Sequence, residues 1–233
     1  MSTPEFLRAL LRGDPVTLRH SIERRDLFFI CIGIIIGGAG IYGAAMGWWR
    51  CGMQAVYTGI KIPLVILLTT LFNSLLNAIL APLLGLNLTY RQSFAIILMT
   101  FTITALVLAG FAPIAFFVVW NTPPLHDATR LVSPEYGFLQ LCHVTFIAFA
   151  GVTGNVRLLP LLQACGGNRA VARKVLLAWL AGNLFLGSQI CWVLRPFIWD
   201  PARPVEFVGR EAFRGSFYET IFEALRRLIF SES

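Results

Sequence analysis

Charged residues are scarce in this sequence. Only 13% of its 233 residues are Asp, Glu, Lys or Arg, whereas 57% are hydrophobic and the mean hydropathy is +0.72. A soluble domain carries roughly a quarter charged residues, because polar side chains must cover its surface. The few charges also lie between long apolar runs instead of alternating with them. This scarcity excludes an ordinary water-soluble globule and indicates a protein whose main solvent is lipid.

The net charge of +7 lacks the pattern of nucleic-acid binding. No basic run is interleaved with the exposed aromatic residues that a strand-binding groove needs. The Arg and Lys residues instead cluster at the ends of apolar runs, where they orient helices and contact anionic head groups. We therefore expect membrane lipids, and no nucleic acid, among the partners.

The sequence also lacks every common pattern for catalysis, metal binding or disulfide bonding. Its five cysteines are an odd number and no pair has CxxC spacing. There is no HExxH, no P-loop and no glycine-rich dinucleotide fingerprint, and Ser188 does not lie in a GxSxG elbow. We expect no enzymatic activity, no cofactor and no metal. A membrane-embedded enzyme with a metal at His143 stays as a third alternative.

What the sequence does contain is five apolar runs long enough to cross a bilayer. They predict an all-α fold, a polytopic transmembrane helix bundle of about five spans with amphipathic interfacial helices at both termini. Pro63 is expected in the first turn of the second span, after a short connection over 51–60. The link over 155–168 contains a piece, 158–164, that could re-enter the membrane. The expected spans are about 27–47, 62–84, 94–120, 137–154 and 170–194.

Amphipathic arms are expected on both sides of this 27–195 bundle. Residues 1–26 are basic and begin with the capping box Ser2-Thr3-Pro4-Glu5, and 196–233 contain a second box at Ser216 that opens a final helix. Both helices are too charged to span and should lie on the membrane or on a partner. Their apolar faces are the expected partner contacts: Phe6, Leu10 and Leu11 on the first arm, and Phe217, Ile221, Phe222 and Leu225 on the second.

Six glycines fall within 15 residues of the first span, and five of them recur at intervals of three or four residues. Two pairs have GxxxG spacing, which reduces one helical face to backbone and lets a neighbouring helix approach closely. We expect this face to pack against another helix. The residues are Gly33, Gly37, Gly40, Gly43 and Gly47.

Polar side chains inside the spans allow two interpretations. Each can form a local hydrogen bond between helices, which is the common role of amides and histidines in membranes, or together they can line a polar path. In the first case the protein is a structural or accessory subunit, and in the second a transporter of a small solute or lipid. The residues are Asn73, Asn77, Gln140, His143, Asn183 and Gln189.

The distribution of basic residues predicts the orientation. With five spans, the N-terminal arm and the links around Arg91 and over 155–174 share one side and hold most of the Arg and Lys residues of the first 174 positions. The positive-inside rule then places the N-terminus in the cytoplasm and the C-terminus outside.

The arrangement resembles bacterial members of the Yip1 (YIPF-like) family of five-span membrane proteins. The resemblance covers residues 14–195 and rests on Asp14-Pro15, on the glycine-rich span ending in Tyr42-Gly43-Ala44-Ala45-Met46-Gly47, and on Lys61-Ile62-Pro63-Leu64 opening a segment that runs to Leu83-Leu84-Gly85. The match is degenerate, since the acidic and tyrosine-glycine signatures of the eukaryotic members are absent. It implies a five-helix bundle in the bacterial cytoplasmic membrane, with a cytoplasmic N-terminus and no enzymatic activity. Together with the packing faces, it favours a non-enzymatic subunit of a larger membrane complex, with other membrane protein subunits as partners.

Overall fold

The protein is an all-α bundle with five helices long and apolar enough to cross a membrane. The computed structural model describes residues 2–24, 26–123, 134–166, 168–195, 197–198 and 204–219, and no strand occurs in these ranges. The helices, in chain order, are α1 (Thr3–Arg12), α2 (Pro15–Ser21), α3 (Asp26–Gly47), α4 (Gly52–Leu83), α5 (Tyr90–Asn121), α6 (Pro134–Arg157), α7 (Leu159–Gly166) and α8 (Arg169–Leu194).

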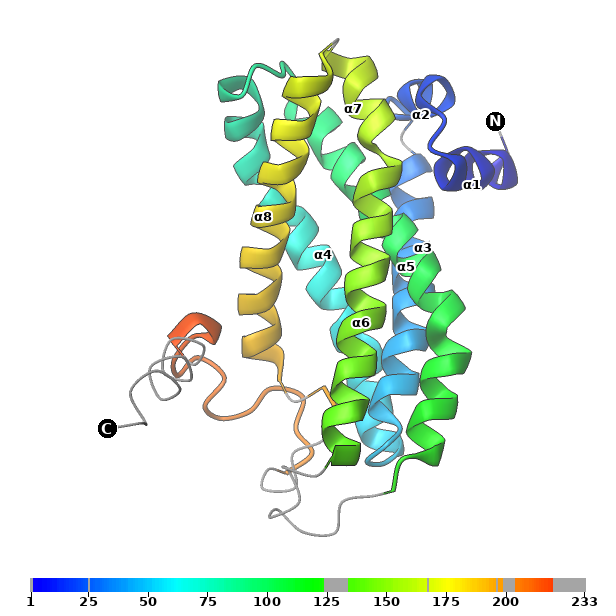
Figure 1. Ribbon diagram of the computed structural model, residues 1–233, viewed down its shortest axis with the longest axis vertical. Helices are drawn as coiled ribbons and strands as arrows, with labels where there is room; N and C mark the ends of the chain where they lie inside the picture. Colours follow the sequence, from blue (N-terminus) through cyan, green and yellow to red (C-terminus); the bar gives the residue numbers. More distant parts are fainter. Residues whose placement is uncertain are drawn as a thin grey trace.

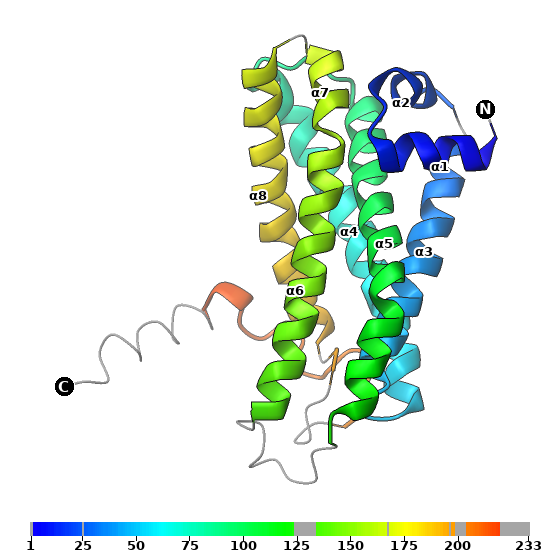
Figure 2. The same ribbon diagram turned by 45° about the vertical axis from the view of Figure 1, so that its right-hand side comes forward.

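The long helices stand side by side, and α1 and α2 lie across one end of the bundle (Figures 1 and 2). Helix α3 packs against both α4 and α5, while α6 packs on α5 and α8 packs on α4. Helix α5 is the most buried of the five spans and α8 the least. The bundle therefore has a core around α3, α4 and α5, with α6 and α8 added on its outside.

The second span begins earlier than the sequence predicted. Helix α4 starts at Gly52 and runs through Pro63 without a break, so 51–60 is not a connection. The sequence predicts Pro63 in the first turn, whereas a membrane helix tolerates proline in its interior when neighbours satisfy the freed backbone groups. Lys61 therefore lies nine residues inside the helix, about 13 Å along its axis.

The link after the fourth span is helical. Helix α6 runs to Arg157, a turn at Leu158 interrupts it, and α7 continues to Gly166. Leu161 and Leu162 of α7 are fully buried, because α7 packs against α8 and α2. The Arg19 guanidinium of α2 also donates to the carbonyl of Ala164, 3.1 Å away, near the C-terminal end of α7.

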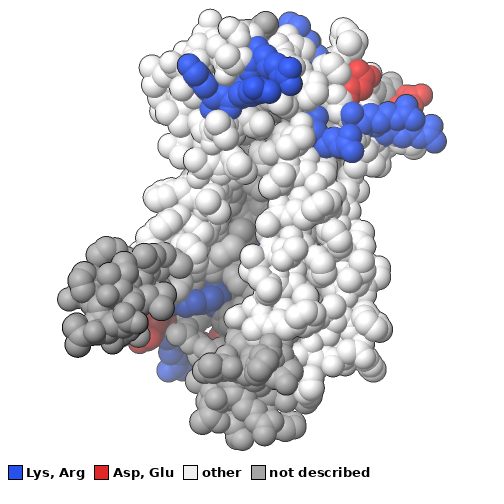
Figure 3. Space-filling model, viewed as in Figure 1, with Lys and Arg blue, Asp and Glu red and all other residues white. Residues whose placement is uncertain are grey.

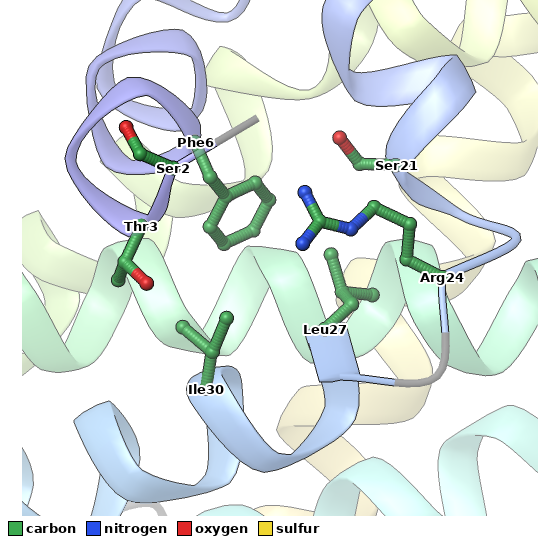
Figure 4. Close-up of a pocket in the computed structure, with 7 residues that line it drawn as sticks. All are labelled: Ser2, Thr3, Phe6, Ser21, Arg24, Leu27 and Ile30. Atoms are coloured by element: carbon green, nitrogen blue, oxygen red, sulfur yellow. The ribbon is translucent and has the colours of Figure 1, made fainter.

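The N-terminal arm packs on its own bundle. Ser2 and Glu5 form the predicted capping box of α1. Phe6 and Leu10 are buried, which removes them from the expected partner-contact surface, and Leu11 alone of that set remains exposed. Figure 4 shows the Phe6 ring pointing from α1 toward Leu27 and Ile30 of α3, around a cavity of about 10 Å³. An amphipathic face covers this chain's own core in preference to a partner because the end of α3 offers apolar surface beside it.

The arm turns sharply at Gly13, where φ is +71°. A Cβ atom there would lie 2.5 Å from the carbonyl oxygen of Arg157, so the site requires glycine for its backbone angle and for its contact with α6. This contact fixes the position of α1 and α2 against the α6–α7 junction.

Acid is expected to loosen the arm before the spans. Hydrogen bonds from Ser2 lower the pKa of Glu5 from its ordinary 4.5, and those from Thr17 and the Val16 amide lower the pKa of Asp14 from its ordinary 3.8. A lowered folded-state pKa gives stability that is complete above the ordinary pKa and lost as the pH falls through the folded value. The protection factors of the α1 and α2 amides, which compare exchange with the intrinsic rate at each pH, should therefore fall below about pH 4 while those of α5 stay high. An equal fall in α5 would contradict this local role.

The second arm is described only to Glu219. Ile221, Phe222 and Leu225, three of its four expected partner contacts, lie outside the described residues. Phe217 is half-buried, and its backbone amide donates to Oε1 of Gln189, 3.3 Å away. We name residues 197–198 and 204–219 the C-terminal strap, because they bind α4 and α8 at the end of the bundle opposite to α1.

Basic side chains gather at the end of the bundle that carries α1, α2 and the α7–α8 connection (Figure 3). Acidic side chains lie among the basic ones at both ends, as in the ion pairs of Arg24 with Asp26 and of Arg214 with Glu211. On this face the larger gathering of basic side chains is at the α1 end (Figure 3).

Candidate functional site

The glycine face of α3 divides into two halves with different surroundings. Gly43 and Gly47 press against α4, where an added Cβ would lie 2.5 Å from the Thr58 carbonyl oxygen and 2.6 Å from the Gln54 carbonyl oxygen. Gly40 approaches the backbone of Gly59 less closely. These three glycines let the backbones of α3 and α4 approach each other closely.

Gly33 and Gly37 form the other half, and there is open space beside both of them. Both are exposed, and a Cβ atom at either would meet nothing within 4 Å. Phe29 and Ile36 beside them are 79% and 52% exposed. One GxxxG pair of α3 therefore serves the internal contact with α4, and the other presents a flat apolar surface to the membrane.

A row of buried polar side chains follows helix α4 from one end toward the other. We name it the polar stripe; its members are Gln54, Thr58, Lys61, Thr69, Asn73 and Asn77, each at most 2% exposed. It runs over 24 residues, a rise of about 35 Å, which is comparable to the roughly 30 Å of a bilayer core. The sequence predicted only its last two members. A helix start at Gly52 puts Gln54 and Thr58, four residues apart, on the same face, whereas Thr69, four residues before Asn73, already lies within the predicted span.

The half of the polar stripe from Thr69 to Asn77, which we call its inner half, faces α8. The Asn73 amide nitrogen donates to Oδ1 of Asn183 at 2.5 Å and to the Trp179 carbonyl at 3.3 Å, and it is the Asn73 Oδ1 that accepts from Asn77 at 2.8 Å. Gly182 allows this approach, since an added Cβ would overlap Oδ1 of Asn73. Three of the predicted intramembrane polar residues thus form one network, and that network holds α8 on α4.

Some polar atoms at this interface carry no hydrogen bond among the described residues. They are Oγ1 of Thr69, Oδ1 of Asn77 and Nε1 of Trp179, all buried. A buried polar group without a partner destabilises a protein by about 1–3 kcal/mol. The α4–α8 interface is therefore hydrogen-bonded at Asn73, while buried polar atoms on both sides of Asn73 have no hydrogen bond among the described residues.

The half of the polar stripe from Gln54 to Lys61, which we call its outer half, is covered by the C-terminal strap. The carbonyl oxygen of Phe197 accepts from the Thr58 hydroxyl at 2.6 Å and from the Gln54 amide at 3.2 Å. The Lys61 ammonium donates to the carbonyl of Glu206 at 3.5 Å and lies 5.9 and 5.5 Å from the ring centres of Phe197 and Phe207. Backbone carbonyls and aromatic faces both stabilise a cation away from water. This is how a fully buried lysine is accommodated in a chain with so few charges.

The strap also binds α8. The Tyr218 hydroxyl lies 2.6 Å from the Ser188 hydroxyl and donates to the Phe185 carbonyl at 2.7 Å, while its ring stacks on that of Phe185. Trp192 donates to the carbonyl of Arg214 at 3.4 Å. The strap thus joins the outer ends of α4 and α8, whose inner parts are joined by the asparagine network.

Removing the polar anchors on α4 is expected to release the strap. The double variant Gln54→Leu/Thr58→Val deletes both donors to the Phe197 carbonyl, each worth about 0.5–1.5 kcal/mol. Hydrogen exchange of residues 204–207 should rise about tenfold or more. Thr100→Val is the control, because the Thr100 hydroxyl bonds to Ile96 of its own helix. A strap equally protected in the double variant and the control would show that these bonds do not hold it.

The remaining predicted polar residues lie at other contacts. His143 is buried, and its Nδ1 lies 2.9 Å from the Tyr42 hydroxyl, which joins α6 to α3. Gln140 is exposed on α6, and Gln189 binds the strap. Within the described ranges no group of three His, Cys, Asp or Glu side chains is placed to hold a metal ion. Asn73, Asn77 and Asn183 therefore form one network, whereas Gln140, His143 and Gln189 lie at other places in the bundle.

No family model, no curated protein and no solved structure matches this chain. The resemblance to the Yip1 family accordingly rests on the sequence motifs alone, and the function must be argued from the geometry of the bundle.

Proposed function

We propose that this integral membrane protein is a non-enzymatic structural or accessory subunit of a larger membrane complex. The observation that supports this most strongly is the use of the polar side chains in its spans. Asn73 and Asn183 join α4 to α8, His143 and Tyr42 join α6 to α3, and Gln189 holds the strap. Catalysis or ion coupling requires ionisable groups that converge on one place. Polar groups that connect separate pairs of helices favour a role in assembly instead.

A second observation concerns the surface that these contacts leave open. Gly33 and Gly37 are exposed on α3 and have exposed apolar side chains beside them. The Gln140 side chain is exposed on α6. In hydrocarbon, small-residue faces favour close helix approach, and amides seek hydrogen-bond partners on neighbouring helices. Both features are typical of spans that pack against the transmembrane helix of another subunit.

A photo-crosslinking amino acid at Phe29 tests this proposal. Phe29 borders the open glycines, whereas Ile79 of α4 is 67% exposed elsewhere and serves as the control position. We expect a protein adduct of one defined mass from position 29 and none from position 79. The adduct should disappear in Gly37→Leu, which fills the open face without touching the α3–α4 contact. Equal adducts from both positions, or an adduct that persists in Gly37→Leu, would contradict the proposal.

We further propose a bacterial cytoplasmic membrane with the N-terminus in the cytoplasm. Support comes from the basic end of the bundle, to which α1, Arg91 and the α7–α8 connection contribute. Labelling intact cells with a membrane-impermeant thiol reagent tests the orientation in two single-cysteine variants of a cysteine-free protein. Gly209→Cys at the strap should react from outside and Thr3→Cys should not; the reverse pattern would refute it.

One observation favours a transporter as the second candidate. The unpartnered atoms of Thr69, Asn77 and Trp179 lie along the polar stripe, which approaches the length of a bilayer core. A solute or lipid head group that moved along the stripe would satisfy them in turn. Flux through liposomes containing the purified protein, lost in Asn77→Leu, would favour this function over assembly.

A further inference from the structure

Three hydrogen-bond donors lie on one face of α4, under the C-terminal strap. They are the Gln54 amide, the Thr58 hydroxyl and the Lys61 ammonium, which follow one another at intervals of four and three residues. All three side chains are fully buried. We name them the donor cluster, which extends over about 10 Å of the helix axis.

The strap supplies backbone carbonyl oxygens as acceptors to the donor cluster. Gln54 and Thr58 both donate to the oxygen of Phe197, at 3.2 and 2.6 Å. Lys61 donates to the oxygen of Glu206 at 3.5 Å. A hydrogen bond with an ionised acceptor is roughly twice as strong as one between neutral groups. A carboxylate or phosphate therefore offers the donor cluster oxygen atoms in the same number and with a negative charge that a backbone carbonyl lacks.

The strap has little regular structure in its described part. It crosses the end of the bundle opposite to α1 (orange in Figure 1) and forms no helix between 204 and 216. Two backbone hydrogen bonds close turns within 209–214. From 204 to 219 Ala212 alone is buried, and Phe213 is 85% exposed. Segments with few buried apolar contacts open at a lower free energy than the core, so we expect the strap to open more readily than the spans.

We propose that the donor cluster is a binding site for an oxyanion, a carboxylate or phosphate group, and that the strap is its lid. In the closed state the carbonyl oxygens of Phe197 and Glu206 take the place of the anion's oxygens. When the anion binds, Gln54, Thr58 and Lys61 donate to it and the strap lifts from α4. The anion and the closed strap exclude each other, so each weakens the other's binding by the same factor. The proposal does not rest on the subunit function.

Competition with a free anion tests this site. The full chain is held in a maltoside detergent, which carries no phosphate, and is titrated with sodium phosphate or acetate against sodium chloride of equal ionic strength and pH. We expect hydrogen exchange of the 205–207 amides to rise about tenfold at saturation, because the strap is displaced. As a bulk salt, phosphate strengthens burial and slows such exchange, so the expected sign separates binding from a general salt effect.

Three variants separate an anion site from a strap that is only loosely held. Lys61→Met keeps the apolar stem and removes the charge, so neither anion should change the exchange of 205–207. Phe207→Ala removes the ring beside the ammonium and its contact with Tyr57, so the closed strap competes less. The anion concentration at half effect should then fall about tenfold. Arg173→Gln removes an exposed charge at the opposite end of the bundle and should respond as the wild type does.

A second titration identifies the source of the anionic group. Phosphatidylglycerol is added to the same micelles without free phosphate or acetate. A response to the free anions assigns the site to a soluble ligand, and a response to phosphatidylglycerol alone assigns it to a lipid head group. A wild-type strap that responds to none of them, or a response that persists in Lys61→Met, would overturn the proposal. If Lys61→Met does not fold, an unchanged half-effect concentration in Phe207→Ala would overturn it equally.

Discussion

Gly43→Leu is expected to prevent stable folding of the bundle, whereas Gly33→Leu in the same helix is expected to leave it intact. A Cβ atom at Gly43 lies 2.5 Å from the Thr58 carbonyl and 3.0 Å from the Ile62 side chain, so α3 and α4 would have to separate. Overpacking a core typically destabilises by about 1–3 kcal/mol, and a clash with backbone, which cannot change rotamer, belongs at or above the upper end.

Gly33 provides the matched control. It belongs to the other GxxxG pair of the same span, but a Cβ atom there would meet nothing within 4 Å. Both substitutions change helix propensity and hydropathy equally, so their difference isolates packing. The measurement is the folded fraction of each variant in mild detergent as the temperature rises. Equal melting of the two variants would show that α3 and α4 do not pack as described.

Asn73→Leu is expected to detach α8 from α4. The substitution conserves volume but removes the bonds to Asn183, to the Trp179 carbonyl and to Asn77. Two of these bonds cross to α8, since Asn77 belongs to α4 as Asn73 does. Hydrogen bonds between membrane helices average about 0.6 kcal/mol and reach about 1.7 kcal/mol each, so losing the two that cross to α8 amounts to about 1–3 kcal/mol. Helix α8 is the least buried span and, apart from α4, packs on α7.

Thr102→Val is the control for this prediction. Its buried hydroxyl bonds to the Leu98 carbonyl of its own helix, and its other contact, with Cys31, joins α5 to α3 and lies away from the α4–α8 interface. Crosslinking between cysteines introduced at Thr69 and Gly187, which face each other across α4 and α8, reports the contact directly. We expect crosslinking to fall in Asn73→Leu and to persist in Thr102→Val. If it persists in both variants, the asparagine network is not the main link between α4 and α8.

Composition and hydropathy are sufficient to predict the all-α membrane bundle and its five spans. Lipid requires every backbone polar group to be satisfied within a helix, so a long apolar run leaves little choice of structure. The capping box at Ser2 was also predictable, because it depends on residues three positions apart.

Contacts between distant parts of the chain were not predictable in the same way. The sequence marks the glycines of α3 but not which of them face α4, since that depends on the rotation of the helix. It marks Phe6 and Leu10 as one apolar face but not that the end of α3 covers them. Lys61 looked like a residue at the membrane surface, and only the strap, 136 positions further at Phe197, explains its burial.

The central claim is that the polar groups of the spans serve assembly of a membrane complex. Its most direct test is the mass of the protein extracted from its native membrane in lipid nanodiscs without detergent. We predict a discrete particle in which this 25.9 kDa chain is joined in fixed proportion by other membrane proteins. A particle that contains this chain alone would contradict the account.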